Sequence, residues 1–224
     1  MPSRKPLFRI IFLVLILLSV ITYVFLFSTS SKSEAPVVAN RSSNPYNTNL
    51  RDSAISLLHD GDLVLRLGSD MTSYMLSQLN QRTKAYSHCG IVFIEDGKPY
   101  IYHSIGGEDN PDQKIRRDSA AFWFSPANNL AIGIARFSLD DTELNTFREV
   151  IRQYYTDKRM FDMEFDLETD DRLYCAEMIY KGIDKAMDTH NFIKPINIFG
   201  LRCIDIDGLF LNDHTKLICQ LRYK

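Results

Sequence analysis

Hydrophobic and polar residues follow different periods in different segments of the chain, and these periods predict its secondary structure. Apolar residues at helical spacing predict helices over residues 51–58, 71–81, 140–155 and 175–187. Short apolar runs bounded by turn residues predict strands over residues 63–67, 90–94, 99–104, 115–124 and 130–137, and residues 188–224 are expected to mix strand and loop. The order of these elements predicts an α+β fold with an antiparallel sheet packed against helices.

Two local signals support particular elements. Asp96-Gly97 separates two predicted strands and is a strong hairpin-turn sequence. Asp140 or Asp141 is a suitable cap for the helix that follows, and Glu143 places a further acidic group in its first turn.

An uncharged apolar run, Ile10–Phe27, is about as long as the roughly 20 residues that a membrane-spanning helix needs. Arg4, Lys5 and Arg9 precede it, which favours a cytoplasmic N-terminus and an exported remainder. We therefore expect an N-terminal transmembrane helix with the rest of the protein on the extracytoplasmic, periplasmic side. A cleaved signal peptide, processed near Ser28–Ser33, is the alternative.

The expected organisation has three parts. Residues 1–28 form a cytoplasmic stub and anchor, residues 29–50 form a linker rich in serine, asparagine and proline, and residues 51–224 form one domain. The whole chain has 26 basic and 28 acidic side chains, and removing residues 1–27 removes three cations and no acid, which leaves 23 and 28. This acidic balance argues against a nucleic-acid partner.

The four cysteines show neither a CxxC motif nor the spacing of zinc ligands, and no metal or organic cofactor is expected. Cys203 and Cys219 form either a disulfide or two buried thiols. The alternating acids between Asp162 and Asp171 lack the glycine and glutamate positions of an EF-hand, so we interpret them as a solvated loop.

Cys175 opens an apolar-periodic helix, where unpaired backbone N–H groups and the helix dipole stabilise a thiolate. His88 begins a predicted buried strand far upstream. A cysteine with a distant histidine is typical of Cys-His hydrolases when the fold brings the two together. Cys89 follows His88 on the strand, so its side chain is expected on the opposite face, in the core.

Three short motifs resemble a known family: Gly61-Asp62-Leu63-Val64, Tyr86-Ser87-His88-Cys89-Gly90-Ile91-Val92, and Leu173-Tyr174-Cys175-Ala176-Glu177-Met178-Ile179. They resemble the YiiX/YebB-like branch of the circularly permuted NlpC-type cysteine hydrolases, over about residues 58–187. The histidine strand precedes the cysteine helix here, as in permuted members. The resemblance implies a permuted papain-like fold.

By resemblance, Cys175 is the nucleophile, His88 is the general base and acid, and His103 on the next strand orients His88. His103 follows His88 by 15 residues, slightly more than the usual gap in the family, so Tyr102 and Glu95 are the alternatives for the third position. A thiolate paired with an imidazolium would attack an acyl carbon, and the backbone N–H of Cys175 would stabilise the oxyanion.

The sequence thus predicts a membrane-tethered thiol hydrolase that cleaves an amide or an ester. Cell-wall peptides and acylated lipids are the two candidate substrate classes. A catalytically silent binding or scaffold module of the envelope, with the same fold, is the alternative of a different class.

Overall fold

The computed structural model describes residues 18, 22, 41–107, 110–187, 192–198 and 200–224. The predicted anchor, apart from two single residues, and most of the predicted linker lie outside the described residues. In the described part of the chain, no helix has both the length and the apolar character needed to cross a membrane.

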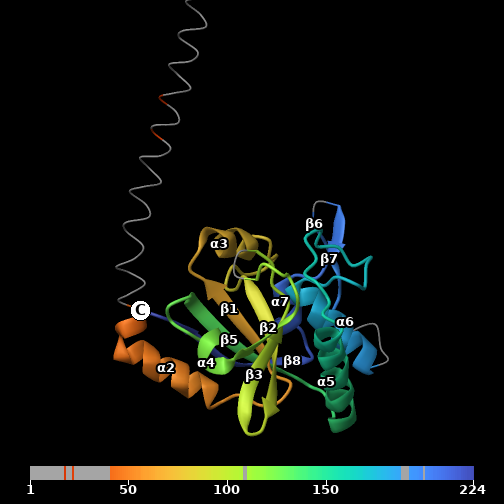
Figure 1. The fold of residues 1–224 in the computed structure, drawn as a ribbon, viewed down its shortest axis with the longest axis horizontal. Helices are drawn as coiled ribbons and strands as arrows, with labels where there is room; N and C mark the ends of the chain where they lie inside the picture. Colours follow the sequence, from red (N-terminus) through yellow and green to blue (C-terminus); the bar gives the residue numbers. More distant parts are fainter. Residues whose placement is uncertain (1–17, 19–21, 23–40, 108–109, 188–191, 199) are drawn as a thin grey trace, which may run out of the picture.

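An antiparallel sheet forms the centre of the described structure (Figure 1). Its strand order is β4-β3-β2-β1-β5-β8, and each neighbouring pair is antiparallel. The strands of this sheet are β1 (Leu63–Gly68), β2 (His88–Glu95), β3 (Lys98–His103), β4 (Arg116–Ser119), β5 (Asn129–Phe137) and β8 (Thr215–Arg222). A separate short hairpin consists of β6 (Ile196–Ile198) and β7 (Leu201–Cys203).

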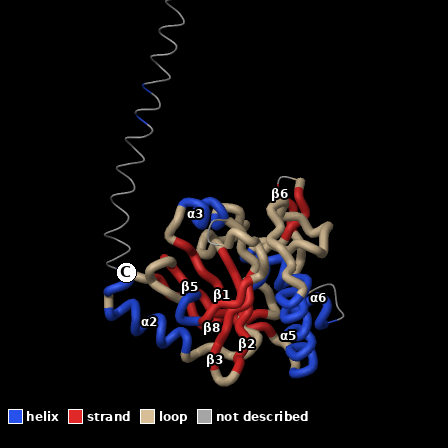
Figure 2. Tube along the Cα trace, in the orientation of Figure 1, coloured by secondary structure: helices blue, strands red, loops and turns tan. Residues whose placement is uncertain are grey.

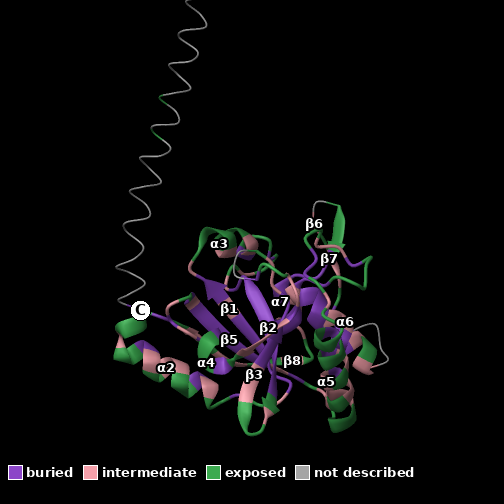
Figure 3. Cartoon of the chain, viewed as in Figure 1, coloured by how far each residue is buried: buried purple, intermediate pink, exposed green. Residues whose placement is uncertain are grey.

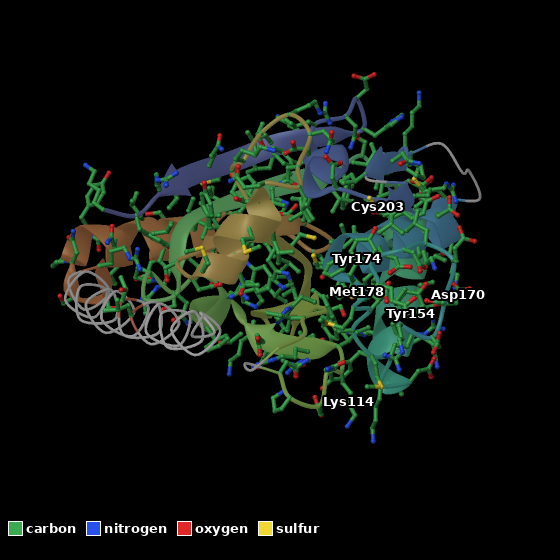
Figure 4. The ribbon with its side chains drawn as sticks, turned by 90° about the horizontal axis from the view of Figure 1, so that it is seen from above. Lys114, Tyr154, Asp170, Tyr174, Met178 and Cys203 are labelled. Atoms are coloured by element: carbon green, nitrogen blue, oxygen red, sulfur yellow. The ribbon has the colours of Figure 1, made fainter. Side chains whose placement is uncertain are left out.

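Helices cover both faces of the sheet (Figure 2). The helices on one face are α5 (Asp141–Thr156), α6 (Cys175–Met187) and α7 (Ile206–Phe210), and those on the other are α2 (Pro45–Ile55) and α4 (Ala120–Trp123). A further helix, α3 (Met71–Ser77), follows β1. The inner strands β1, β2 and β5 are buried between these layers (Figure 3), and Tyr154, Tyr174 and Met178 gather on the α5–α6 side (Figure 4).

The α+β class, the antiparallel sheet and several elements agree with the sequence predictions. The hairpin turns at Asp96 and Gly97, whose φ angles of 48° and 74° are the positive pair that a tight primed turn requires. Helix α5 begins after Asp140, which forms a capping box with Glu143. Helix α6 begins at Cys175 and ends at Met187, as predicted.

Four predicted segments differ from the structure. Residues 206–210, expected as strand or loop, form the helix α7, because Asp205 caps its first turn. Helix α2 starts at Pro45, inside the predicted linker, because Asn44 caps its first turn and proline suits that position. Helix α3 ends at Ser77, and buried Asn80 then bonds the Tyr86 carbonyl at 2.7 Å. Residues 120–123 form a helix where a strand was predicted, since the Ser119 hydroxyl accepts from the Phe122 N–H and starts a helical turn.

An ion pair joins the start of β1 to β5. The Asp62 carboxylate, which is fully buried, lies 2.7 Å from Nε and 2.9 Å from Nη2 of Arg136. This supports a structural role for Asp62. All four cysteines are free thiols, including Cys203 and Cys219.

Candidate active site

The pairing of β2 with β3 places His88 and His103 side by side. In this register Val92 faces Ile101, and alternation along each strand puts both imidazoles on the face covered by α4. His88 Nε2 lies 3.0 Å from His103 Nδ1. The structure thus selects His103 as the neighbour of His88.

Gly90 makes room for this arrangement. A Cβ atom at position 90 would lie 2.6 Å from Ile101 Cγ2 and 3.1 Å from His103 Cβ. A side chain there would push β3 away from β2 or displace His103. Steric crowding therefore explains why a glycine occupies position 90, two residues after His88.

Asp118 extends the histidine pair, and the sequence analysis did not single it out. Strand β4 pairs with β3 so that Asp118 lies opposite Ile101, and its Oδ2 is 2.9 Å from His103 Nε2. Its other oxygen accepts from Arg116 at 2.9 Å. Burial would raise the pKa of this carboxyl, but the bonds and charges of His103 and Arg116 hold it below its usual value.

These contacts determine the tautomers of both histidines. The ionised Asp118 can only accept, so His103 carries its proton on Nε2 and presents an unprotonated Nδ1. His88 must then donate from Nε2 to that atom. The atom of His88 left free to accept a proton is Nδ1.

The imidazoles lie under the single tryptophan of the chain. Trp123 is fully buried, and its ring centroid is 4.7 Å from that of His103 and 5.3 Å from that of His88. The Arg66 guanidinium carbon lies 4.6 Å from the same ring centroid. Burial, together with the Arg66 charge, lowers the pKa of His88 well below its usual value and that of His103 to about 4, so both are neutral at pH 7.

Cys175 lies at the N-terminus of α6, partly buried. The Tyr174 N–H donates to the Glu177 carboxylate at 3.0 Å and closes the first turn of the helix. Hydrogen bonding with the Cys89 side chain and with backbone N–H groups, including that of Ala176, favours the thiolate form of Cys175. These bonds outweigh burial and lower the pKa of Cys175, while burial raises that of Cys89, so Cys175 is the thiol of the pair that ionises.

The structure joins the predicted residues in two groups rather than one. Cys89 packs in the core on the α6 side of the sheet, as predicted, and Cys175 contacts it there, whereas His88 bonds His103 on the α4 side. Among the contacts of the described residues, none joins the Cys175 sulfur to the His88 imidazole. Both groups nevertheless meet at the beginning of β2, where His88 and Cys89 are consecutive.

The alternatives for the third position lie elsewhere. The Tyr102 hydroxyl donates to Glu95 at 2.6 Å, and Glu95 is paired with Arg117 and Arg152. Glu95 ends β2, seven residues beyond His88, which is roughly 23 Å along a strand. Neither side chain contacts His88.

The element order, the sheet topology and the position of α6 together allow a comparison with solved structures. The fold is similar to that of yiiX. That protein, solved as "metalloprotein yiiX from Escherichia coli O157:H7, DUF1105", superposes with a TM-score of 0.59 at 15% identity, covering 73% of this chain and 98% of yiiX. No protein-family model and no curated protein matches the chain. The predicted YiiX-like character is thus confirmed for the fold.

The description of yiiX as a metalloprotein raises the question whether the same fold holds a metal here. Across residues 41–107, 110–187, 192–198 and 200–224, no three histidine, cysteine, aspartate or glutamate side chains are grouped as metal ligands are. Three of the four ring nitrogens of His88 and His103 are taken up by hydrogen bonds with each other and Asp118. The described residues therefore do not fit a metal centre at this site.

Proposed function

We propose that the protein is a thiol hydrolase with a permuted papain-like fold, Cys175 as nucleophile and His88 as general base and acid. The observation that carries the proposal is a thiol of lowered pKa at the first residue of α6, at the same end of β2 as a histidine with a fixed tautomer. His103 and Asp118 position His88 and leave its Nδ1 free to take a proton.

In this mechanism the Cys175 thiol gives its proton to His88 Nδ1, and the sulfur attacks the acyl carbon. The backbone N–H of Cys175 donates to the oxyanion that forms. The bond to the leaving nitrogen or oxygen breaks, and the leaving group takes the proton from His88. Water then gives a proton to His88 and hydrolyses the thioester, which restores the Cys175 thiol.

The reaction requires Cys175 and His88 to meet when substrate binds. Catalytic hydrogen bonds are often long or misaligned before the substrate is present and shorten in the complex. The thiol and the imidazole approach the start of β2 from opposite faces of the sheet, so the substrate complex must bring them together past the end of this strand.

Sequence features support a location and two substrate classes. The apolar run Ile10–Phe27 favours a membrane anchor with the domain on the extracytoplasmic, periplasmic side. There the substrate is a cell-wall peptide or an acylated lipid, cleaved at an amide or an ester.

A silent binding module is the second candidate, and one observation favours it. Cys175 contacts Cys89 and not His88, as a structural thiol buried near a helix start would. In that case the histidine pair and Asp118 only stabilise the sheet.

An activated ester distinguishes the two. We expect the full chain in detergent micelles to release one p-nitrophenolate per protein from p-nitrophenyl acetate in a rapid phase, with the acetyl group found on Cys175. His88→Ala should slow this phase by about 100-fold, within the range of general acid–base catalysis. Cys175→Ser should abolish it, and Cys219→Ser is the matched control that should retain it. Acetylation that is equal on all cysteines would refute the hydrolase and favour the silent module.

A further inference from the structure

Helix α3 presents its apolar side chains to solvent. Met71, Tyr74, Met75 and Leu79 have exposed fractions of 72%, 60%, 64% and 40%. Their spacing of three and four residues places them on one side of the helix and its following turn. The buried residue of α3 is Ser77, a polar side chain, so the usual arrangement of an amphipathic helix is reversed.

The α3 face lies at the same end of the sheet as the candidate active site. Helix α3 directly follows β1, whose Arg66 is paired with His88 on β2, and it contacts both strands. In Figure 1 it stands beyond the ends of β1 and β2 and away from α2 and α5. A surface that bound α3 would therefore adjoin the start of β2.

The segment that carries this face holds cations and no acid. Residues 71–84 contain no carboxylate, and their two cations, Arg82 and Lys84, are exposed, while Asp70 caps the helix and Asp207 accepts from the backbone N–H groups of Arg82 and Thr83. Exposed apolar side chains flanked by cations are typical of helices that lie in the interface of an anionic bilayer.

The chain itself brings a bilayer within reach. The uncharged run Ile10–Phe27 has the composition of a membrane segment, and only residues 28–40 separate it from Arg41. Fully extended, a segment of that length spans at most about 45 Å. A domain held so close to a membrane meets lipid more often than any other apolar partner.

We propose that the exposed face of α3, formed by Met71, Tyr74, Met75 and Leu79, docks into the surface of the lipid bilayer. Docking places the start of β2 at the headgroup level, within reach of an acyl chain that leaves the membrane. If the hydrolase proposed above is correct, this favours acylated lipids over cell-wall peptides as its substrates.

A tryptophan reporter tests docking without any activity assay. Tyr74→Trp is introduced into the full chain, which is reconstituted into phosphatidylcholine–phosphatidylglycerol vesicles with either brominated or ordinary acyl chains. Tyr46→Trp on α2, at a tyrosine of similar exposure (48%), is the matched control. Bromine quenches only tryptophans that touch acyl chains, and the buried Trp123 contributes the same background to both variants.

We expect brominated lipid to reduce the emission of Tyr74→Trp well below its value in ordinary lipid, and to leave that of Tyr46→Trp unchanged. A second reporter, Met75→Trp, should behave like Tyr74→Trp and guards against a folding defect at one position. Equal emission of the α3 reporters in both lipids would overturn the proposal, including the case in which α3 is instead covered by protein. Because the reading is independent of acylation, docking and hydrolysis can succeed or fail separately.

Discussion

Asp118 is the residue on which the orientation of both histidines depends. Its carboxylate fixes the proton of His103 on Nε2, and His103 in turn fixes that of His88. Asp118 touches no reacting atom in the proposed mechanism and is a positioning residue. The sequence alone does not indicate this role for an aspartate that follows two arginines in a predicted strand, since only the pairing of β3 with β4 shows which histidine it faces.

We predict that Asp118→Asn lowers the rate of Cys175 acetylation by about 10- to 100-fold. This is part of the rate enhancement that a general base provides. The amide can present either an acceptor or a donor to His103, so the tautomers are no longer fixed. Nitrogen-15 NMR of the two imidazoles should show the mixed tautomers, which a merely structural role would not produce. Asp112→Asn, at an exposed carboxylate on the segment before β4, should change neither measurement, and an unchanged rate in Asp118→Asn would remove Asp118 from the site.

At the scale of elements, the site depends on how closely β3 lies against β2. The hairpin was predictable because Asp96-Gly97 defines its turn, and the capped helix α5 and the Cys175 helix were predictable from their periodicity. The structure of segment 115–124 was not predictable, because its four apolar residues 120–123 suit a strand or a helical turn equally. The Ser119 cap decides for the helix and so brings Trp123 over the histidines.

The contact at Gly90 leads to a second prediction. Gly90→Ala should lower the free energy of unfolding by about 2 kcal/mol through overpacking, and it should slow Cys175 acetylation because His103 is displaced. Gly97→Ala is the control: it also costs about 1 kcal/mol, since φ is 74° there, but no atom lies near its Cβ. It should not alter acetylation. Urea unfolding and the ester assay measure both effects, and equal acetylation in the two variants would contradict the role of Gly90.

For the whole molecule, the buried histidines His88 and His103 and the buried Glu177 make stability depend on pH in opposite directions. Burial lowers the pKa of His103 from 6.5 to about 4, so the unfolded chain binds more protons between these values and stability falls as the pH falls from 6.5 to 4. Burial raises the pKa of Glu177 from 4.5 to about 7, despite its pairing with Lys181, so this group removes stability as the pH rises through that range.

The contributions of His103 and Glu177 are each about 3 kcal/mol by linkage and opposite in sign, so the lowered pKa of His88 leaves a net rise in wild-type stability as the pH rises from 4.5 to 6.5. We predict that His103→Asn makes the rise of the free energy of unfolding with pH smaller over this range, and that Glu177→Gln makes it steeper. Urea unfolding at several pH values provides the measurement. Parallel profiles for the wild type and both variants would show that neither group is titrated as described.

Sequence patterns alone predicted the elements that carry the candidate site residues better than the arrangement of these residues in space. A helix start, a strand start and a family resemblance pointed to Cys175, His88 and His103. In the structure all three lie near the start of β2. The contact of Cys175 with Cys89, on the face away from His88, was not foreseen. It depends on how α6 packs across β2 and β3, a long-range arrangement that local patterns do not encode.

The measurement that tests the central claim most directly is the pH dependence of alkylation at each cysteine of the full chain, followed by mass spectrometry. The bonds from Cys89 and the helix N–H groups lower the pKa of Cys175, whereas burial raises those of Cys203 and Cys219. We predict that the midpoint for Cys175 lies below the ordinary thiol value of about 8.5, that those of Cys203 and Cys219 lie above it, and that Cys89→Ala raises the Cys175 midpoint. A Cys175 midpoint equal to or above those of the other cysteines would contradict an activated nucleophile and favour the silent module.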